Sequence, residues 1–188
     1  MQLNTTIPTL NRWQTPPSID TLQSLYDTSA DQWHNNLARL GQIHDYQLLF
    51  KYQAVRDRLR HLDQTARILD CGVGTGAFSA ALLDSIEQPA HISGIDISYP
   101  MLTHARQNLK NRCTTLDLRW GDIQSLPFAD KSFDAVIFAH VLEHMADPVE
   151  TLREMARVLK PGAPLIGSVT RKGVGQCLLS LRWHNRGY

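Results

Sequence analysis

Short apolar runs alternate with longer amphipathic segments along most of the chain after residue 65. Five of these runs have the length and composition of buried strands: ARILDCG, HISGIDIS, LDLRWGDI, FDAVIFAHV and PLIGSVT. Helical patterns separate most of them, in GAFSAALLDSIE, YPMLTHARQNLKN and DPVETLREMARVL, and Ser98 and Asp147 are predicted to cap the second and third of these helices. Because strands that alternate with helices pair in parallel through right-handed crossovers, the pattern predicts an α/β fold with a mostly parallel sheet and flanking helices.

The leading part of the chain shows helical spacing without strand-like runs, so it is predicted to form an N-terminal helical cap. Ser18 is predicted to cap a helix over IDTLQSLYD, and Asp31 a second helix that stops at Gly41. A third helix is predicted over DYQLLFKYQAVRDRLRHL. The chain is accordingly divided into residues 1–64, the helical lead-in, and residues 65–188, the α/β domain.

Composition and charge restrict the possible binding partners and the cellular compartment, but they do not change the predicted fold. The formal net charge of +1 creates no strong field that would favour nucleic acid or an anionic membrane. No apolar run approaches the ~20 residues that a membrane span needs, and the N-terminus lacks the pattern of a signal peptide. Cys71, Cys113 and Cys177 show no metal spacing and favour a reduced chain. We therefore expect a cytoplasmic protein without a metal site, a nucleic-acid partner or stable membrane insertion.

A glycine-rich loop, ILDCGVGTGAF at residues 68–78, joins the first predicted strand to a helix. Such a unit presents backbone N–H groups and a helix N-terminus to a ligand, and glycines allow the ligand to come close. The spacing fits two patterns. Gly72, Gly74 and Ala77 match the dinucleotide pattern, whereas Gly72, Gly74 and Gly76 match G-x-G-x-G. The loop indicates a nucleotide-like cofactor and leaves its identity open.

Three acids that follow successive predicted strands help to identify the cofactor. Asp70 precedes the glycine loop, where a carboxylate would repel a pyrophosphate but suits a ligand that carries an ammonium and a sulfonium. Asp96 lies where a carboxylate accepts hydrogen bonds from ribose hydroxyls. A dinucleotide and a sulfonium-bearing nucleoside both contain a ribose, so this acid does not distinguish between them. Asp122 either accepts the exocyclic amine of adenine, with Ile123 covering the ring, or caps a turn.

DCGVGTG, GIDIS, GDIQSLPF, FDAVIFAHVLEHM and ARVLKPGAPLIGSV occur in this order, and together they resemble the class I S-adenosylmethionine-dependent methyltransferases. The resemblance covers roughly residues 62–170 and is strongest to the small-molecule and quinone or lipid branch. It implies a Rossmann-like sheet with S-adenosylmethionine across the carboxyl ends of the strands. It also implies a cofactor-binding set: Asp70, Cys71, Gly72, Gly74, Gly76, Asp96, Ile97, Met101, Gly121, Asp122, Ile123, Ala139 and His140.

Within this set, the positions in the family motifs imply a role for several residues. Asp70 and Gly72 would lie near the methionine part of the cofactor, and Asp96 would take the ribose hydroxyls. Ile97 would flank the adenine ring, whose edge would be held by Asp122 and Ile123. Ala139 and His140 would line the pocket of the methyl donor.

The chemistry of methyl transfer asks little of the protein beyond positioning. A sulfonium methyl group is already activated, so transfer needs an in-line nucleophile about 3 Å away, and a base only where the acceptor must lose a proton. His140, Glu143 and His144 are the candidate catalytic residues, and they either supply that base or only shape the pocket floor. HVLEH also matches a zinc-protease pattern, but that pattern needs one long helix, and here His140 closes a predicted strand.

The chain lacks an N-P-P-Y-type stretch, so a nucleic-acid amino group is not favoured as acceptor. The resemblance to the small-molecule branch implies a small-molecule acceptor and leaves O-, N- and C-methylation open. Tyr26, Trp33 and Tyr46 in the leading helices either cover the pocket or belong to the core. The alternative functions are an NAD-dependent oxidoreductase, which the dinucleotide pattern and Asp96 favour, and a non-catalytic or truncated cofactor-binding subunit.

The C-terminal part departs from the family pattern. Only about 18 residues follow PLIGSVT, and KGVGQCLLSLRWHNRGY is predicted to supply little more than a helix. The last strands of the family fold are therefore expected to be missing, which would leave the fifth strand as an exposed edge. Either the chain is truncated, or a homodimer, another partner or the N-terminal helices are expected to cover that edge.

Overall fold

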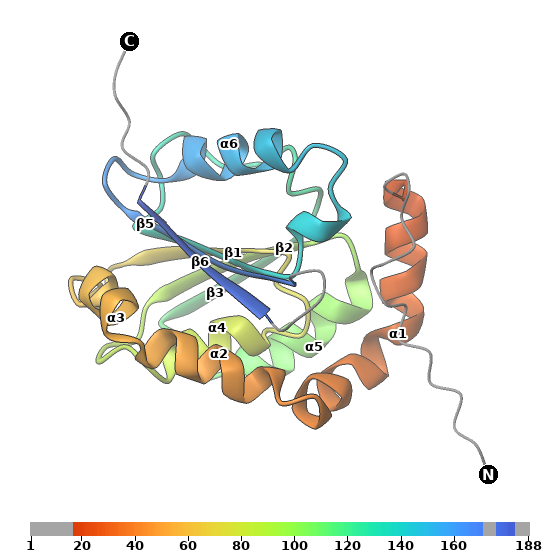
Figure 1. The fold of residues 1–188 in the computed structure, drawn as a ribbon, viewed down its shortest axis with the longest axis horizontal. Helices are drawn as coiled ribbons and strands as arrows, with labels where there is room; N and C mark the ends of the chain where they lie inside the picture. Colours follow the sequence, from red (N-terminus) through yellow and green to blue (C-terminus); the bar gives the residue numbers. More distant parts are fainter. Residues whose placement is uncertain (1–16, 171–175, 183–188) are drawn as a thin grey trace.

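The computed structural model describes residues 17–170 and 176–182, and a six-stranded sheet forms its centre (Figure 1). The strand order is β3-β2-β1-β4-β5-β6, and all neighbours are parallel except β5 and β6. All five strands predicted from the sequence form. The strands are β1 (Arg67–Cys71), β2 (His91–Asp96), β3 (Thr115–Trp120), β4 (Ala135–Ala139), β5 (Pro164–Thr170) and β6 (Gln176–Arg182).

The strand order reverses between β1 and β4, because β2 and β3 extend the sheet on one side of β1 and β4 and β5 on the other. In such sheets a crevice opens at the carboxyl ends of the two strands where the order reverses. Leu69 pairs with Val136 and Cys71 with Phe138, so β1 and β4 end side by side. The fold thereby places the glycine loop after β1 beside the HVLEH segment after β4.

Helices cover both faces of the sheet (Figure 1). One face carries α6 (Pro148–Val158), which shares an apolar cluster with the strands. The other face carries α2 (Gln42–Lys51), α3 (Gln53–Leu59), α4 (Ala77–Leu83) and α5 (Tyr99–Leu109), and α1 (Ile19–Arg39) packs beside α5. The Rossmann-like α/β architecture is confirmed. No helix in the described ranges is long and apolar enough to cross a membrane.

The predicted helix caps are confirmed where side-chain oxygens meet free N–H groups. Ser18 accepts from the Thr21 N–H, and Ser98 accepts from the Met101 N–H at the start of α5. Asp147 accepts from two N–H groups at the start of α6. Each cap satisfies donors that would otherwise lack an intrahelical partner.

The helix boundaries within the leading part were predicted wrongly in two places. Asp31 caps no second helix, because α1 runs without a break from Ile19 to Arg39. Leu22, Ala30 and Leu37 are buried along this single helix, and their packing outweighs the tendency of Asp31 to start a new one. The third predicted helix is divided at Tyr52, whose backbone is extended (ψ 129°).

The expectation that the fifth strand is an exposed edge is also wrong. Residues 176–182 form β6, which pairs antiparallel with β5 along seven residue pairs, from Pro164 with Arg182 to Thr170 with Gln176. A short leucine-rich stretch fits a helix or a strand equally well by periodicity. An antiparallel return also needs only a short connection, so the residues after PLIGSVT suffice for one more strand. Because β6 covers the edge of β5, this edge no longer gives a reason to expect a partner there.

The helical lead-in and the sheet share one apolar cluster. Leu49, Phe50 and Val55 of the leading helices pack with Ile68 of β1 and Phe78 of α4, and all of these side chains are buried. The division of the chain at residue 64 stays a prediction.

Candidate functional site

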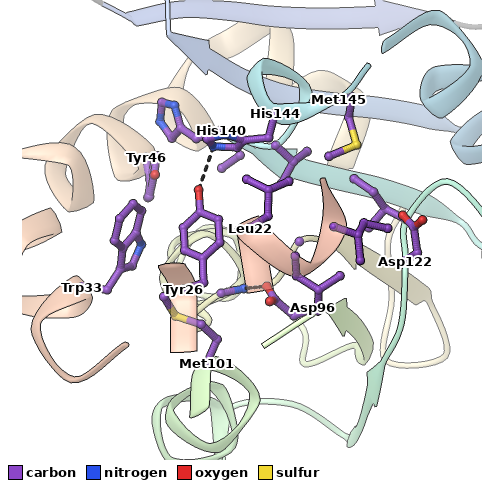
Figure 2. A pocket seen from close by; sticks show the side chains of 17 residues that line it. Leu22, Tyr26, Trp33, Tyr46, Asp96, Met101, Asp122, His140, His144 and Met145 are labelled. Atoms are coloured by element: carbon purple, nitrogen blue, oxygen red, sulfur yellow. Dashed lines mark hydrogen bonds between the residues drawn. The ribbon is translucent and has the colours of Figure 1, made fainter. Parts of the chain in front are cut away.

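A cleft opens at the carboxyl ends of β1, β2 and β4, where α1 lies across it (Figure 2). The cleft is open to solvent, and the space of about 740 Å³ between its walls includes part of that solvent. Of the predicted site residues, ten line it: Gly72, Gly74, Asp96, Ile97, Met101, Asp122, Ile123, Ala139, His140 and His144.

The glycine loop is shaped by positive backbone angles and close contacts. Gly72 has φ 72°, and a Cβ atom there would lie 2.1 Å from Cγ1 of Val141. Only glycine therefore fits at this position without a shift of the neighbouring segment. Gly76 (φ 80°) begins α4, and a Cβ atom there would lie 3.0 Å from Leu109, so this glycine serves the packing of α4 on α5. Gly72 and Gly74 line the cleft, whereas Gly76 is not among its lining residues.

Asp96 connects the loop to the start of α5 and faces the cleft. Its Oδ2 accepts from the Gly74 N–H at 2.8 Å, and its Oδ1 accepts from the Ser98 N–H at 2.9 Å. A carboxylate has about four acceptor positions, so two remain for a ligand hydroxyl. Burial raises the pKa of the Asp96 carboxyl to about 6, against the lowering effect of these N–H groups. This arrangement agrees with the predicted role at a ribose.

Asp70 and Cys71 lie behind the glycine loop, and both are fully buried. Oδ2 of Asp70 accepts from the Ser79 hydroxyl at 2.6 Å, and its Oδ1 has no hydrogen-bond partner among the described residues. Burial raises the pKa of the Asp70 carboxyl to about 7 and that of the Cys71 thiol well above its ordinary value. Neither residue reaches the wall of the cleft, and contact of Asp70 with a cofactor stays a prediction.

The loop after β3 forms a second part of the cleft wall. Asp122 and Ile123 line it, and Ile123 is buried. Oδ1 of Asp122 accepts from the Gln124 N–H at 2.9 Å, so this carboxylate caps a turn while it faces the cleft. Gly121 lies outside the lining, and a Cβ atom there would lie 2.9 Å from Ile95, so its place is set by packing.

The three candidate catalytic residues meet after β4. His140 follows the strand in a left-handed conformation (φ 56°), and its N–H donates to the Ser168 carbonyl. Nδ1 of His140 lies 3.2 Å from Oε1 of Glu143, and Nε2 of His144 lies 2.7 Å from the Tyr26 hydroxyl. Glu143 and His144 belong to a 3₁₀ turn (Leu142–His144) rather than to the long helix of a zinc-protease motif.

Burial sets the protonation of three side chains in and beside this group, His144, Tyr26 and Tyr46. Burial lowers the pKa of His144, so its imidazole is neutral at pH 7. Burial raises the pKa values of the Tyr26 and Tyr46 hydroxyls well above their ordinary value, so both keep their protons. The group therefore supplies neutral hydrogen-bonding side chains beside the His140–Glu143 pair. No group of three possible metal ligands occurs within residues 17–170 and 176–182.

An aromatic and apolar wall completes the cleft, and the sequence left this assignment open. Tyr26 and Trp33 of α1 pack edge to face at 5.4 Å, and the Tyr46 ring lies 5.9 Å from the His140 ring. These side chains line the cleft (Figure 2), and Tyr46 also belongs to the buried core cluster, against which Trp33 packs, so both interpretations apply. Further lining residues were not predicted: Ile19, Leu22, Val141 and Met145.

The signal for the α1 wall was present in the sequence. Its cleft-lining residues lie at positions 19, 22, 26 and 33, with spacings of one face of a helix. The predicted break at Asp31 placed Trp33 in a separate helix and hid this pattern.

Comparisons with known proteins identify the domain. A family model described as a methyltransferase domain matches residues 69–167. The demethylmenaquinone methyltransferase of Lactiplantibacillus plantarum is 34% identical over 149 residues, which cover 77% of this chain and 60% of that protein. The demethylmenaquinone methyltransferase of Listeria welshimeri is 32% identical over 128 residues, covering 68% of this chain and 54% of that protein. The chain therefore spans less than two thirds of the length of either relative.

Solved structures share the same fold. The Haloferax volcanii complex of the Trm112 methyltransferase activator with a methyltransferase matches at 27% identity and a TM-score of 0.59, covering 77% of this chain and 59% of that one. The [4+2]-cyclase SpnF matches at 24% identity and a TM-score of 0.66, covering 82% of this chain and 61% of that one. The likeness to SpnF concerns the fold alone, since one fold can support several reactions.

Proposed function

This chain belongs to the class I S-adenosylmethionine-dependent methyltransferase family, and on that premise we propose that it transfers a methyl group from S-adenosylmethionine to a small-molecule acceptor. The observation that carries the proposal is the shared cleft. The predicted cofactor residues Gly72, Gly74 and Asp96 line the same cavity as His140 and His144. A donor held by the first group would present its methyl group to an acceptor held beside the second.

The fit of the residues to the nucleoside part supports the cofactor. Asp96 keeps acceptor positions for the ribose hydroxyls, and its burial strengthens such hydrogen bonds. Ile97, Met101 and Ile123 offer apolar surface to the adenine ring, and Asp122 lies beside them. Membership of the methyltransferase family leaves the NAD-dependent alternative without support, since the residues that favoured it fit S-adenosylmethionine equally well.

The methyl group of a sulfonium is transferred to a nucleophile in one in-line displacement, so the protein's part is to orient the acceptor and exclude water. We propose that Ala139 and His140 line the transfer site. We propose that Nδ1–H of His140 donates to the Glu143 carboxylate, 3.2 Å away, a tautomer in which Nε2 is the nitrogen that can accept a proton. Neutral His144, bonded to Tyr26, orients the acceptor rather than carrying charge.

We propose an apolar small molecule as the acceptor. Aromatic and apolar side chains from α1, α2 and the segment after β4 line the cleft, which suits a flat or apolar compound: Leu22, Tyr26, Trp33, Tyr46 and Met145. The relatives named demethylmenaquinone methyltransferase favour a compound of the quinone class. A cytoplasmic location belongs to the same proposal, since soluble cofactor must reach the cleft.

The decisive test is calorimetric titration of the chain with S-adenosylmethionine, its demethylated product and NAD. We expect the first two to bind with micromolar affinity and NAD not to bind. Binding of NAD alone would overturn the proposal, and binding of none of the three by a folded chain would favour the non-catalytic or truncated subunit. Where the cofactor binds, turnover with a panel of quinones, phenols and aliphatic acceptors then identifies the class of acceptor.

A further inference from the structure

The loop that carries the proposed adenine wall is long, and its own hydrogen bonds are few. It leaves β3 at Gly121, passes Asp122 and Ile123 at the cleft, and continues to Asp130 on the α6 side of the sheet. Its internal hydrogen bonds include the Gln124 and Ser125 N–H groups with Asp122 and a short turn at Phe128. Such a loop would keep a fixed position only if other elements hold it.

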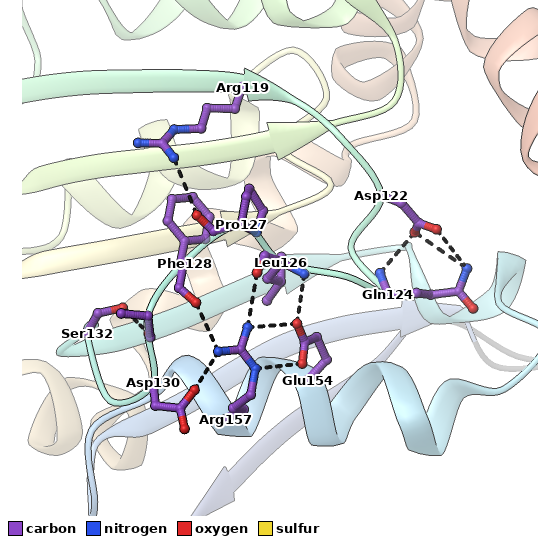
Figure 3. A network of polar contacts seen from close by, with 11 residues as sticks. Arg119, Asp122, Gln124, Leu126, Pro127, Phe128, Asp130, Ser132, Glu154 and Arg157 are labelled. Atoms are coloured by element: carbon purple, nitrogen blue, oxygen red, sulfur yellow. Dashed lines mark hydrogen bonds and ion pairs between the residues drawn. The ribbon is translucent and has the colours of Figure 1, made fainter.

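Arg157 of α6 holds this loop at three points (Figure 3). Its Nη2 donates to the Leu126 carbonyl at 3.0 Å, and its Nη1 donates to the Phe128 carbonyl at 2.9 Å. Nη1 also lies 2.6 Å from Oδ1 of Asp130. A planar guanidinium is well suited to this task, because its donors point in fixed directions toward several acceptors.

Glu154 holds Arg157 in place and adds a contact of its own. Its two carboxylate oxygens accept from Nε and Nη2 of Arg157, both at 2.8 Å, in a two-point ion pair. Oε1 also accepts from the Leu126 N–H at 2.8 Å. Arg157 in turn holds the pKa of Glu154 below its ordinary value, so the pair is charged at neutral pH. Both backbone groups of Leu126 are thereby bound by one ion pair.

We propose that Glu154 and Arg157 are positioning residues for the cofactor, which act by fixing the loop that presents Asp122 and Ile123 to the adenine. The inference rests on the proposed function, since it assumes that this part of the cleft binds the nucleoside. Leu126 lies only three residues from Ile123 and is itself buried, so a shift of its backbone displaces the cleft wall. Neither residue of the pair is among those that line the cleft.

The same helix offers a matched control. Glu150 and Arg153 form an ion pair with the same i, i+3 spacing on α6, but both side chains are 60% exposed, and within the described residues neither side chain bonds to the loop after β3. The side chains of Glu154 and Arg157 are only 20% and 32% exposed. Exposed pairs of this kind contribute little, so changes at Glu150 and Arg153 report only on the helix.

The test compares E154Q and R157K with E150Q and R153K in the full chain, using titration with S-adenosylmethionine and with adenosine. We expect E154Q and R157K to weaken both ligands by about tenfold, the cost of one lost charged hydrogen bond, and the controls to bind as wild type. Turnover at saturating cofactor should stay within about twofold, so that KM for the cofactor rises without kcat. If R157K unfolds, E154Q still tests the inference, because glutamine has nearly the same side-chain volume as glutamate.

A double-mutant cycle separates positioning from a general loss of stability. If Arg157 acts through the loop, adding R157K to D122A should weaken binding less than it does in wild type, whereas independent effects would add. Wild-type affinity in E154Q and R157K, or additive losses in the cycle, would overturn the inference. If wild type itself binds neither ligand, the proposed function fails first. That outcome is distinguishable, because the variants then have no affinity to lose.

Discussion

The two walls of the cleft are built in different ways. On the glycine-loop side, backbone groups determine the geometry. The N–H groups of Gly72 and Val73 both donate to the Ile95 carbonyl, and the Gly74 N–H donates to Asp96. On the α1 side, the polar contacts with the sheet domain run through side chains, such as Tyr26 with His144. A wall fixed by backbone tolerates few sequences, whereas a wall of helix side chains can be changed while the fold is kept.

Apart from the Tyr26–His144 hydrogen bond, the polar contacts of α1 with the sheet side of the cleft are weak. Asp31 and His104 lie 3.0 Å apart, but the Asp31 side chain is 94% exposed. His34 reaches Thr75 only at 3.5 Å. An exposed contact such as that of Asp31 contributes on the order of 0–1 kcal/mol, so apolar packing contributes most to holding α1 in place. We infer that substitutions on the glycine-loop side of the cleft disturb the backbone, whereas substitutions on the α1 side change mainly side-chain packing.

The largest effect is expected from a methyl group added to the glycine loop. Gly72→Ala should lower the free energy of unfolding by roughly 3–5 kcal/mol and abolish cofactor binding, because the new Cβ would overlap Val141 and φ is positive. Urea unfolding and calorimetry measure both. Gly41→Ala is the matched control on the α1 side. It has a similar φ of 74° but nothing within 4 Å, so it should cost only about 1 kcal/mol. Equal losses would contradict the contrast between the walls.

The pH dependence of the free energy of unfolding should depend most on Asp70, the buried carboxylate behind the glycine loop. Burial raises the pKa of Asp70 to about 7, so the folded state binds more protons than the unfolded state above the ordinary pKa of the group. Its contribution to stability should be complete below about pH 4 and fall by roughly 2–4 kcal/mol as the pH rises to about 7 and beyond. Asp96, with a pKa of about 6, should add a smaller slope of the same sign.

Asp70→Asn tests this assignment, because an amide of the same shape carries no titrating proton. The free energy of unfolding of this variant, measured from pH 4 to pH 8, should depend less on pH than that of wild type. An unchanged slope would exclude Asp70 as the group responsible.

Asp96→Ala should separate ligand affinity from stability on the cofactor side. It removes the acceptor proposed for the ribose hydroxyls and should weaken S-adenosylmethionine by roughly 1–3 kcal/mol, as calorimetry measures. Asp31→Ala, on exposed α1 surface, is the control and should leave the affinity unchanged. Unchanged affinity in Asp96→Ala would remove Asp96 from the site.

The smallest effect is expected on the α1 side. Tyr26→Phe removes the hydrogen bond to His144 and should cost about 1 kcal/mol in kcat/KM for the acceptor while the affinity for S-adenosylmethionine is kept. Steady-state kinetics and calorimetry on one preparation give both numbers. If Tyr26→Phe weakened cofactor binding as much as Asp96→Ala, the α1 side would also contribute to cofactor binding, and the contrast between the two walls would be wrong.

Sequence patterns predicted much of the fold, because strands, helix caps and tight turns depend mainly on residues that are neighbours along the chain. The five parallel strands, the caps Ser18, Ser98 and Asp147, and the loop glycines follow from apolar runs, capping oxygens and positive φ. The prediction failed where a local signal competed with packing. Asp31 has the chemistry of a cap but lies inside α1, and the leucine-rich end forms β6 rather than a helix.

The sequence by itself determined the order of strands and helices from β1 to β5, since that order is set by neighbours along the chain. Only the tertiary structure decided which of the acids near the strand ends share a cavity. It placed Asp70 behind the glycine loop and Asp96 in the cleft, although both acids lie in the last two residues of their strands. It also brought Tyr26 to His144, 118 positions away, and Arg157 to the loop at Leu126. Burial and contact across such distances depend on how layers pack, and no local pattern of side chains encodes that packing.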